Sequence, residues 1–146
     1  MASNSSLYDK IVLNPSSRSA PPTQKMYRGF STISGNTENF ALYDLYLIQQ
    51  DILNHFNTRQ GERLMNPEFG CVIWDLMYEP LTSEFQSLIV ENVNRIINYD
   101  PRVAANQVLV TSYQSGIQIE CILTYLSYNV SQKMQLRFDQ ANGLMA

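Results

Sequence analysis

Apolar residues recur every three or four positions in two stretches of the chain, a spacing that places side chains on one face of an α-helix. The first stretch follows Asp44, the expected N-cap, and its apolar positions are Leu45, Ile48, Ile52 and Phe56. The second is expected to begin at Thr82 or Ser83, and its apolar positions are Phe85, Leu88, Ile89, Val93, Ile96 and Ile97. Proline cannot continue the hydrogen-bond ladder of a helix, so the second helix is expected to end at Tyr99-Asp100-Pro101-Arg102.

The C-terminal part of the chain changes to a period of two, which is typical of β-strands with one buried face. Residues 117–125 and 132–138 both alternate in this way, and a strand over 107–113 is joined to them by the turn Gln114-Ser115-Gly116. Residues 71–78, between the helices, fit either a short helix or a strand. The expected fold class is α+β, with two main helices packed on a small, mainly antiparallel C-terminal sheet of three strands.

The N-terminal residues differ from the rest of the chain in composition. Residues 1 to about 26 are rich in Ser, Asn and Pro and have too few apolar groups to offset the entropy cost of folding alone. We therefore expect an extended or flexible arm over residues 1–39 and a single domain over residues 40–146. A chain of 146 residues with 45% apolar content suits one domain of this kind.

Net charge and hydropathy argue against two classes of partner. The chain has 10 Lys and Arg against 13 Asp and Glu, a net charge of −3, so it lacks the basic excess that phosphate binding needs. Its longest apolar runs fall far short of the roughly 20 residues that a membrane helix requires. Neither a nucleic acid nor a membrane is expected as a partner.

The residues that most often bind metals or act as nucleophiles are few. Cys71 and Cys121 lie among apolar neighbours and lack the spacing of metal ligands, so both are expected to be buried free thiols. His55 is the single histidine, near the end of the first predicted helix, with no Ser or Cys motif to pair with. No metal, cofactor or catalytic residue is predicted.

A polar, turn-rich loop, QGERLMNPEFG at residues 60–70, lies between two apolar regions. Asn66-Pro67 suits turn initiation, and Phe69 is expected to anchor the loop in the core. Glu62 and Arg63 fit either a partner contact or plain solvation. Paired carboxylates in such a loop could indicate a glycosidase, which needs one protonated and one ionised carboxyl, but nothing in the spacing marks such a pair.

Four segments then occur in a specific order: TRQGER at 58–63, NPEFG at 66–70, an acidic helix entry at 81–84, and YDPR at 99–102. Together they resemble the baseplate wedge and sheath-initiator family of contractile phage tails. This family is also called lysozyme-like baseplate protein W and has relatives in the type VI secretion baseplate. The resemblance covers about residues 40–139. The family's Glu-Pro-Arg signature stands here as Asp100-Pro101-Arg102, with the acid one methylene shorter.

The resemblance implies a non-enzymatic structural protein of the virion baseplate, made in the host cytoplasm, that connects the inner baseplate to the tail sheath. The expected partners are other baseplate wedge proteins and the tail sheath protein, with the tail tube as a further candidate. The implied wedge contact comprises Asp100, Pro101 and Arg102, together with Glu62 and Arg63 of the loop. For Arg102 the alternative is an ordinary surface ion pair with Asp100.

The first sheath ring is expected to form by strand addition, because the outer strands of a sheet present unpaired backbone groups to another chain. If 117–125 is the central strand, then 107–113 and 132–138 each have an open edge. The residues expected to mark these edges are Thr111, Lys133, Gln135 and Arg137.

Two other function classes stay open on the sequence alone. The family label invites a peptidoglycan hydrolase of the tail, whose carboxylates would be drawn from Glu62, Glu68, Asp75, Glu79 and Glu84. A free-standing regulatory binding module is the third possibility, although it would leave the arm and the strand edges without partners.

Overall fold

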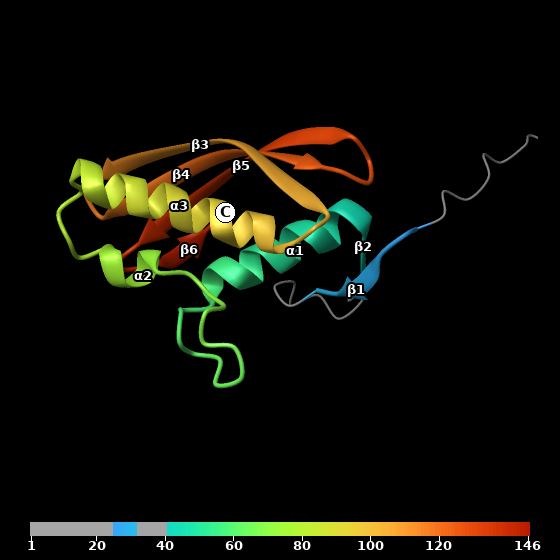
Figure 1. The fold of residues 1–146 in the computed structure, drawn as a ribbon, viewed down its shortest axis with the longest axis horizontal. Helices are drawn as coiled ribbons and strands as arrows, with labels where there is room; N and C mark the ends of the chain where they lie inside the picture. The colour runs from blue at the N-terminus through green and yellow to red at the C-terminus, as the bar shows by residue number, and fades with distance from the viewer. Residues whose placement is uncertain (1–24, 32–40) are drawn as a thin grey trace, which may run out of the picture.

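Three helices lie on one side of a four-stranded antiparallel sheet (Figure 1), which confirms the α+β expectation. A computed structural model describes residues 25–31 and 41–146. Their elements are β1 (Arg28–Phe30), β2 (Ala41–Tyr43), α1 (Asp44–Asn57), α2 (Ile73–Leu76), α3 (Ser83–Tyr99), β3 (Val103–Tyr113), β4 (Gly116–Tyr125), β5 (Val130–Asp139) and β6 (Gly143–Met145).

The strands of the main sheet lie in the order β3-β4-β5-β6. The strand expected at the centre from the sequence, residues 117–125, is β4, which lies between β3 and β5. Along β4, buried side chains alternate strictly with half-buried ones, so the period of two in the sequence corresponds to one face on the core and one face away from the helices. Gly116 begins β4, where an added Cβ would lie 1.9 Å from the Phe138 carbonyl oxygen of β5. Only glycine fits this close approach of two backbones.

The predicted sheet was one strand short, because β6 pairs antiparallel with the last three residues of β5. The buried carboxylate of Asp139 accepts hydrogen bonds from the backbone N–H groups of Ala141 and Asn142, at 2.8 and 3.1 Å. It also accepts one from Ser115 Oγ at 2.9 Å, in the β3–β4 turn. A side-chain-stabilised turn therefore reverses the chain where the sequence shows only a polar stretch.

The start of α1 differs from the sequence prediction, whereas the predicted start of α3 at Thr82 or Ser83 is confirmed. Helix α1 has Tyr43 as its N-cap, and Asp44, the expected cap, is the first helical residue with φ 51°. The Asp44 carboxylate instead accepts hydrogen bonds from the backbone N–H groups of Met26 and Tyr27 and from the Tyr128 hydroxyl, at 2.8, 3.0 and 2.7 Å. Helix α3 begins after Thr82, whose hydroxyl accepts from the Phe85 N–H.

Part of the expected arm lies against the domain. Residues 28–30 form β1, which pairs antiparallel with β2 at the start of α1. The Asp44 bonds described above hold the two residues that precede this strand. The remainder of the expected arm, residues 1–24 and 32–39, lies outside the described residues.

The core forms where the apolar faces of α1 and α3 meet the inner face of the sheet. Trp74 of α2 donates from its indole Nε1 to the Phe56 carbonyl at 2.7 Å and packs edge-on against Phe138. Cys71 and Cys121 are free and buried, and burial raises the pKa of their thiols to about 12 and about 11. In residues 25–31 and 41–146 no helix has the length and apolar content to cross a membrane.

Candidate functional site

The Asp100-Pro101-Arg102 segment is the turn between α3 and β3. The backbone N–H of Asp100 donates to the Ile97 carbonyl and closes the last turn of α3. The backbone N–H of Arg102 donates to Asp100 Oδ1 at 3.0 Å, so the aspartate side chain reaches two residues forward and bends the chain. Proline at the middle position fixes the backbone of this bend and sets the direction of the Arg102 side chain.

The Arg102 guanidinium is held by two carboxylates. Its Nε donates to Asp100 Oδ1 at 2.8 Å and to Oδ2 at 3.1 Å, and its Nη2 also contacts Asp100 Oδ2. Nη2 forms a second ion pair with Asp51 Oδ2 of α1, at 2.7 Å. The guanidinium lies 5.2 Å from the centre of the Tyr27 ring, and the Arg102 side chain is 22% exposed. The expected pair with Asp100 is present, within a larger and partly buried cluster.

Both members of this pair stay charged. Burial raises the pKa of Asp100, but the hydrogen bonds and charge of Arg102 outweigh it and hold the pKa below its ordinary value. The pKa of Arg102 is raised, chiefly by its hydrogen bonds to Asp100. Within the described residues, the Nη1 atom of Arg102 has no hydrogen-bond partner. Among the residues that the structure describes, these donors are therefore not used by the fold.

The 60–70 loop closes on itself above a short stem. A parallel bridge between Arg59 and Cys71 forms the stem, and the Gly61 N–H donates to the Pro67 carbonyl at 2.9 Å. The Glu62 carboxylate accepts the Arg59 N–H at 3.1 Å. At Gly70, φ is 120° and an added Cβ would lie 2.6 Å from the Arg59 backbone, so glycine is required there.

Phe69 attaches this loop to the two long helices through ring contacts. Its ring stacks on His55 of α1 with centroids 3.8 Å apart, and it meets Tyr99 of α3 edge-on at 5.5 Å. The Arg63 guanidinium lies 3.7 Å above the other side of the Phe69 ring. The sequence predicted that Phe69 anchors the loop in the core, but Phe69 is only half-buried. It anchors the loop to the surfaces of the two helices instead.

His55 is uncharged at neutral pH. Burial, followed by the positive charges of Arg95 and Arg63, lowers its pKa to about 4. Arg95 also donates from Nη2 to the Gly70 carbonyl at 3.1 Å and so holds the end of the loop. A neutral imidazole can stack flat on Phe69 without placing a third positive charge beside two arginines.

An open pocket of about 450 Å³ lies between these features. Its walls come from α1, the loop, the end of α3 and the turn, and they bring Arg63 together with Asp100, Pro101 and Arg102. Glu62 does not line it. The sequence did not assign the other polar and aromatic lining residues to a site; these are Asp51, Asn54, His55, Phe69 and Tyr99. Asp51 and His55 lie four positions apart on α1, a spacing that could have indicated a shared face.

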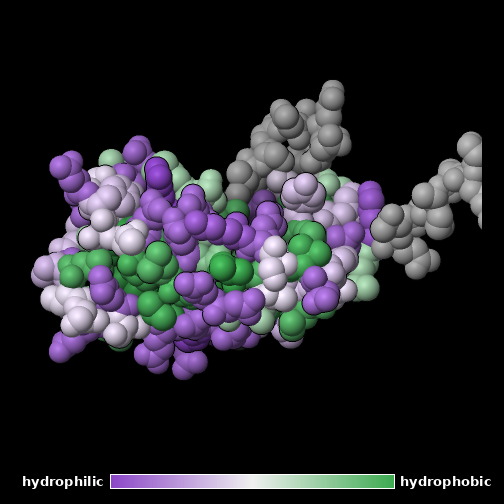
Figure 2. All heavy atoms as spheres, turned by 90° about the horizontal axis from the view of Figure 1, so that it is seen from above, coloured by the Kyte–Doolittle hydropathy of each residue, from purple (hydrophilic) through white to green (hydrophobic). Residues whose placement is uncertain are grey.

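The residues expected at the sheet edges pair with the half-buried positions of β4, so they lie on the face of the sheet away from the helices. Figure 2 shows the molecule from above. Lys133 and Gln135 both contact Glu120 of β4, at 2.8 Å each, and the Thr111 hydroxyl donates to the Gln118 carbonyl at 3.4 Å. The expectation for Arg137 was wrong, because Arg137 pairs with Met145 of β6 and its stretch of β5 is not an open edge.

The part of β5 left open by β6 is therefore shorter than expected and covers residues 130–136. On the opposite side of the sheet, β3 pairs only with β4 among the described strands. Thr111, Lys133 and Gln135 thus lie on strands with an open edge.

The model of the family "Baseplate wedge protein gp25" matches residues 45–133, which include α1, the loop, the pocket and most of the sheet. The chain belongs to the gp25 family of baseplate wedge proteins. The baseplate wedge protein gp25 of Enterobacteria phage T4 is 33% identical over 57 residues, which are 38% of this chain and 43% of the T4 protein. The match thus spans less than half the length of that relative.

Solved structures share the fold of this gp25-family chain at lower identity. A chain of the anti-feeding prophage baseplate has a TM-score of 0.58 and 19% identity, over 68% of this chain and 86% of that one. A chain of the post-contraction pyocin R2 baseplate has a TM-score of 0.56 and 19% identity, over 68% and 98%. A protein from Geobacter sulfurreducens, named a candidate tail lysozyme, has a TM-score of 0.57 and 23% identity, over 64% and 88%.

The low pKa of His55 makes stability depend on pH in a defined window. We expect the free energy of unfolding to fall as the pH is lowered from about 6.5 toward about 4, because the unfolded chain then binds a proton that the folded chain excludes. Urea unfolding between about pH 7 and about pH 5 measures this slope. The matched variant His55→Gln carries no titrating ring and should show a flatter dependence. An equal slope in both proteins would show that His55 is not the group responsible.

Proposed function

We propose that this gp25-family chain is a non-enzymatic structural component of a contractile-tail baseplate, located in the virion, that connects the inner baseplate to the tail sheath. The observation that carries the proposal is the Arg102 cluster, which lines the 450 Å³ pocket. Two carboxylates hold the guanidinium in a fixed direction, while its Nη1 donors have no partner among the described residues. Such a pre-positioned fork suits paired hydrogen bonds to an acidic or carbonyl-rich segment of a wedge subunit.

The pocket wall supports this role better than a plain ion pair does. Tyr99, which is 60% exposed, lines the pocket together with Arg102 and Arg63, and Arg63 lies above the Phe69 ring. Tyrosine and arginine are both enriched in protein–protein interfaces, so this lining suits a contact with another protein. Glu62 contributes to the proposed contact through the loop backbone, because its carboxylate holds the Arg59 N–H.

The contact with the sheath is proposed to use the open strand edges. Residues 130–136 of β5 and the outer side of β3 have no strand beside them among the described residues, so each offers backbone donors and acceptors for an added strand. On β5, Lys133 and Gln135 keep the edge polar through their bonds to Glu120. The tail tube remains a further candidate partner.

A peptidoglycan hydrolase is the alternative that the Geobacter structure's name suggests for that protein. In this chain the pocket's two carboxylates, Asp51 and Asp100, both form ion pairs with Arg102 and are not arranged as a general acid beside a second carboxylate. The acids first considered for such a pair, which are Glu62, Glu68, Asp75, Glu79 and Glu84, are all exposed. A free-standing regulatory module, the third class, would leave the pocket and both edges without a use.

We expect Arg102→Ala to fold and to lower the free energy of unfolding by about 1–3 kcal/mol, because Asp100 loses its partner in a partly buried site. Incorporation into baseplates should fall at least tenfold, a change of about 1.4 kcal/mol or more in binding. Quantitative mass spectrometry of purified baseplates measures it. Arg28→Ala, which removes an exposed arginine from β1, is the matched control. Normal incorporation of a folded Arg102→Ala protein would remove the assigned wedge contact.

Proline on an open edge should stop strand addition by removing a backbone donor or distorting the strand. We expect Gln135→Pro on β5 or Thr111→Pro on β3 to block sheath polymerisation while tube and wedge components still assemble, as seen by electron microscopy of tails. Gln135→Ala keeps the backbone N–H and should polymerise normally. Circular dichroism establishes that each variant is folded. If both folded proline variants seed full-length sheaths, the sheath does not begin on this sheet.

We expect no peptidoglycan hydrolysis between about pH 4 and about pH 8, the range of general-acid pKa values. The purified protein should release no soluble fragments from labelled peptidoglycan, with hen-egg lysozyme as the positive control. Hydrolysis that disappears in Glu62→Gln or Glu68→Gln would favour the enzymatic alternative.

A further inference from the structure

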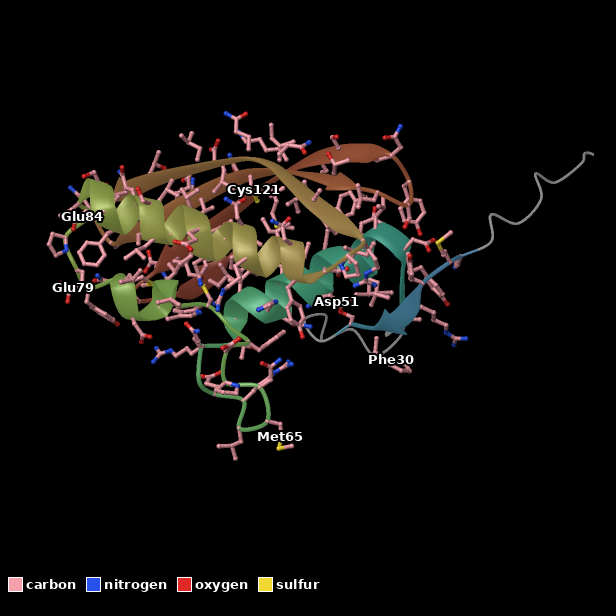
Figure 3. All side chains as sticks on the ribbon, in the orientation of Figure 1. Phe30, Asp51, Met65, Glu79, Glu84 and Cys121 are labelled. Carbon is pink, nitrogen blue, oxygen red and sulfur yellow. The ribbon has the colours of Figure 1, made fainter. Side chains whose placement is uncertain are left out.

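The tip of the loop carries the two most exposed large apolar residues of the described chain. Leu64 is 95% exposed and Met65 is 98% exposed, whereas the next such residue, Phe30, is 75% exposed. Figure 3 shows Met65 at the far end of the loop, pointing away from the helices and the sheet. We call Leu64 and Met65 the knob. Neither side chain stabilises the fold, so their apolar character calls for another explanation.

The knob lies in a hydrogen-bonded turn, and not in a loop without internal hydrogen bonds. The Asn66 N–H donates to the Arg63 carbonyl at 3.2 Å, directly behind the knob, and the Phe69 N–H donates to the Asn66 carbonyl at 3.1 Å. With the Gly61–Pro67 bond and the stem bridge, these bonds define the loop's path on both sides of the tip. A turn fixed in this way loses little conformational entropy when it binds.

The base of the knob is attached to the proposed wedge contact. Arg63, the residue before the knob, lies on the Phe69 ring, and Phe69 stacks on His55. Arg63 and Phe69 both line the 450 Å³ pocket. A partner bound at that pocket would therefore also contact the loop, and the knob lies at the tip of this loop.

Charge decides what class of partner the knob fits. Residues 59–70 contain Arg59 and Arg63 against Glu62 and Glu68, so the loop has no net charge. Such a loop is not drawn to anionic lipids or to nucleic acid, which both require clustered positive charge. An apolar pair in a neutral, ordered turn instead suits an apolar socket on another protein.

We propose that the knob inserts into a preformed apolar socket of a neighbouring protein subunit, the one that also covers the Arg102 pocket. This rests on the proposed function, since that subunit is the wedge partner. Two side chains bury too little area to make a specific interface alone, so the knob acts as a hot spot within the larger contact. The socket has aliphatic or aromatic walls, because a leucine and a methionine offer no polar group to recognise.

Photo-crosslinking in assembled tails tests the proposal. Benzoylphenylalanine is placed at position 65 of the full-length chain in cells that make the tail, and baseplates are purified after irradiation. We expect an adduct to one other tail protein, at apolar residues of that protein. The same group at position 79, an exposed site beyond α2, is the control and should give none. The proposal would be overturned if no adduct formed at position 65 above this control, or if adducts formed only to lipid or to a second copy of this chain.

A third position separates this proposal from the wedge contact. Benzoylphenylalanine replacing Tyr99 reports on the pocket itself. Crosslinks from 99 without crosslinks from 65 reject the knob and keep the wedge contact. Crosslinks from neither position in baseplates that contain the protein reject both.

A pair of double variants measures how much the knob contributes. Leu64→Ser with Met65→Ser should unfold at the parent's temperature, because both side chains are exposed, yet should enter baseplates at least tenfold less well. Leu64→Met with Met65→Leu keeps the apolar surface and should enter nearly as well as the parent. Tyr46→Ser, at a 73% exposed site on α1, controls for general loss of exposed apolar surface. Equal incorporation of the serine variant and the parent would overturn the proposal.

Flotation with vesicles of phosphatidylglycerol and phosphatidylethanolamine examines the lipid alternative. The parent protein should stay unbound. Binding that disappears in the serine double variant would assign the knob to a membrane and overturn the protein socket.

Discussion

A guanidinium that is mostly removed from water has to find its counter-charges within the fold, and Arg102 finds them in separate parts of the chain. Asp100 comes from the α3–β3 turn and Asp51 from α1, while the Tyr27 ring lies nearby. The Arg102 carbonyl accepts the Leu126 N–H at 2.9 Å, from the β4–β5 turn. Because an unpaired charge in this position is costly, these elements hold one another in place. The end of α3, the middle of α1 and the sheet meet at this residue.

The pocket beside Arg102 depends on the same rule applied to His55. Arg63 and Arg95 lie near the imidazole and, together with burial, keep it neutral. A neutral ring can pack flat against Phe69, and this contact joins the loop to α1. The site therefore contains two kinds of group: the ion-paired charges around Arg102 and the neutral imidazole of His55. The shape of the pocket is thus set by ion pairs and ring contacts within the domain itself, without a bound partner.

The sequence predicted the elements whose signal is periodic. Both long helices were found because their apolar residues recur at helical spacing over several turns, and β4 was found because its alternation is unbroken. The role of Asp44 was misassigned because an acid before an apolar run normally caps its own helix. Here its carboxylate is used by residues distant in sequence, Tyr27 and Tyr128. No local pattern reports such a contact.

Short and assembled features escaped prediction for a related reason. Strand β6 has three residues, too few for a period, and its turn depends on the buried Asp139 carboxylate. The pocket needed α1, the loop and the turn to be placed in space. Arg102 was singled out from its motif, whereas the spacing of Asp51 and His55 indicates only that they share a face of α1. The open edge at Arg137 was lost to β6, which is a tertiary effect that alternation alone cannot reveal.

The Asp44 carboxylate also joins three segments through which a pulling force on the chain would pass. A pull on the chain at Lys25 would act along β1, whose three residue pairs with β2 would share the tension with the Asp44 bonds to Met26 and Tyr27. Through the Tyr128 hydroxyl, the same carboxylate passes part of the force to the β4–β5 turn, at the far end of the sheet's central hairpin. Helix α1 is thereby spared from being peeled open from its first turn. Tension applied through this end of the chain is spread into the sheet.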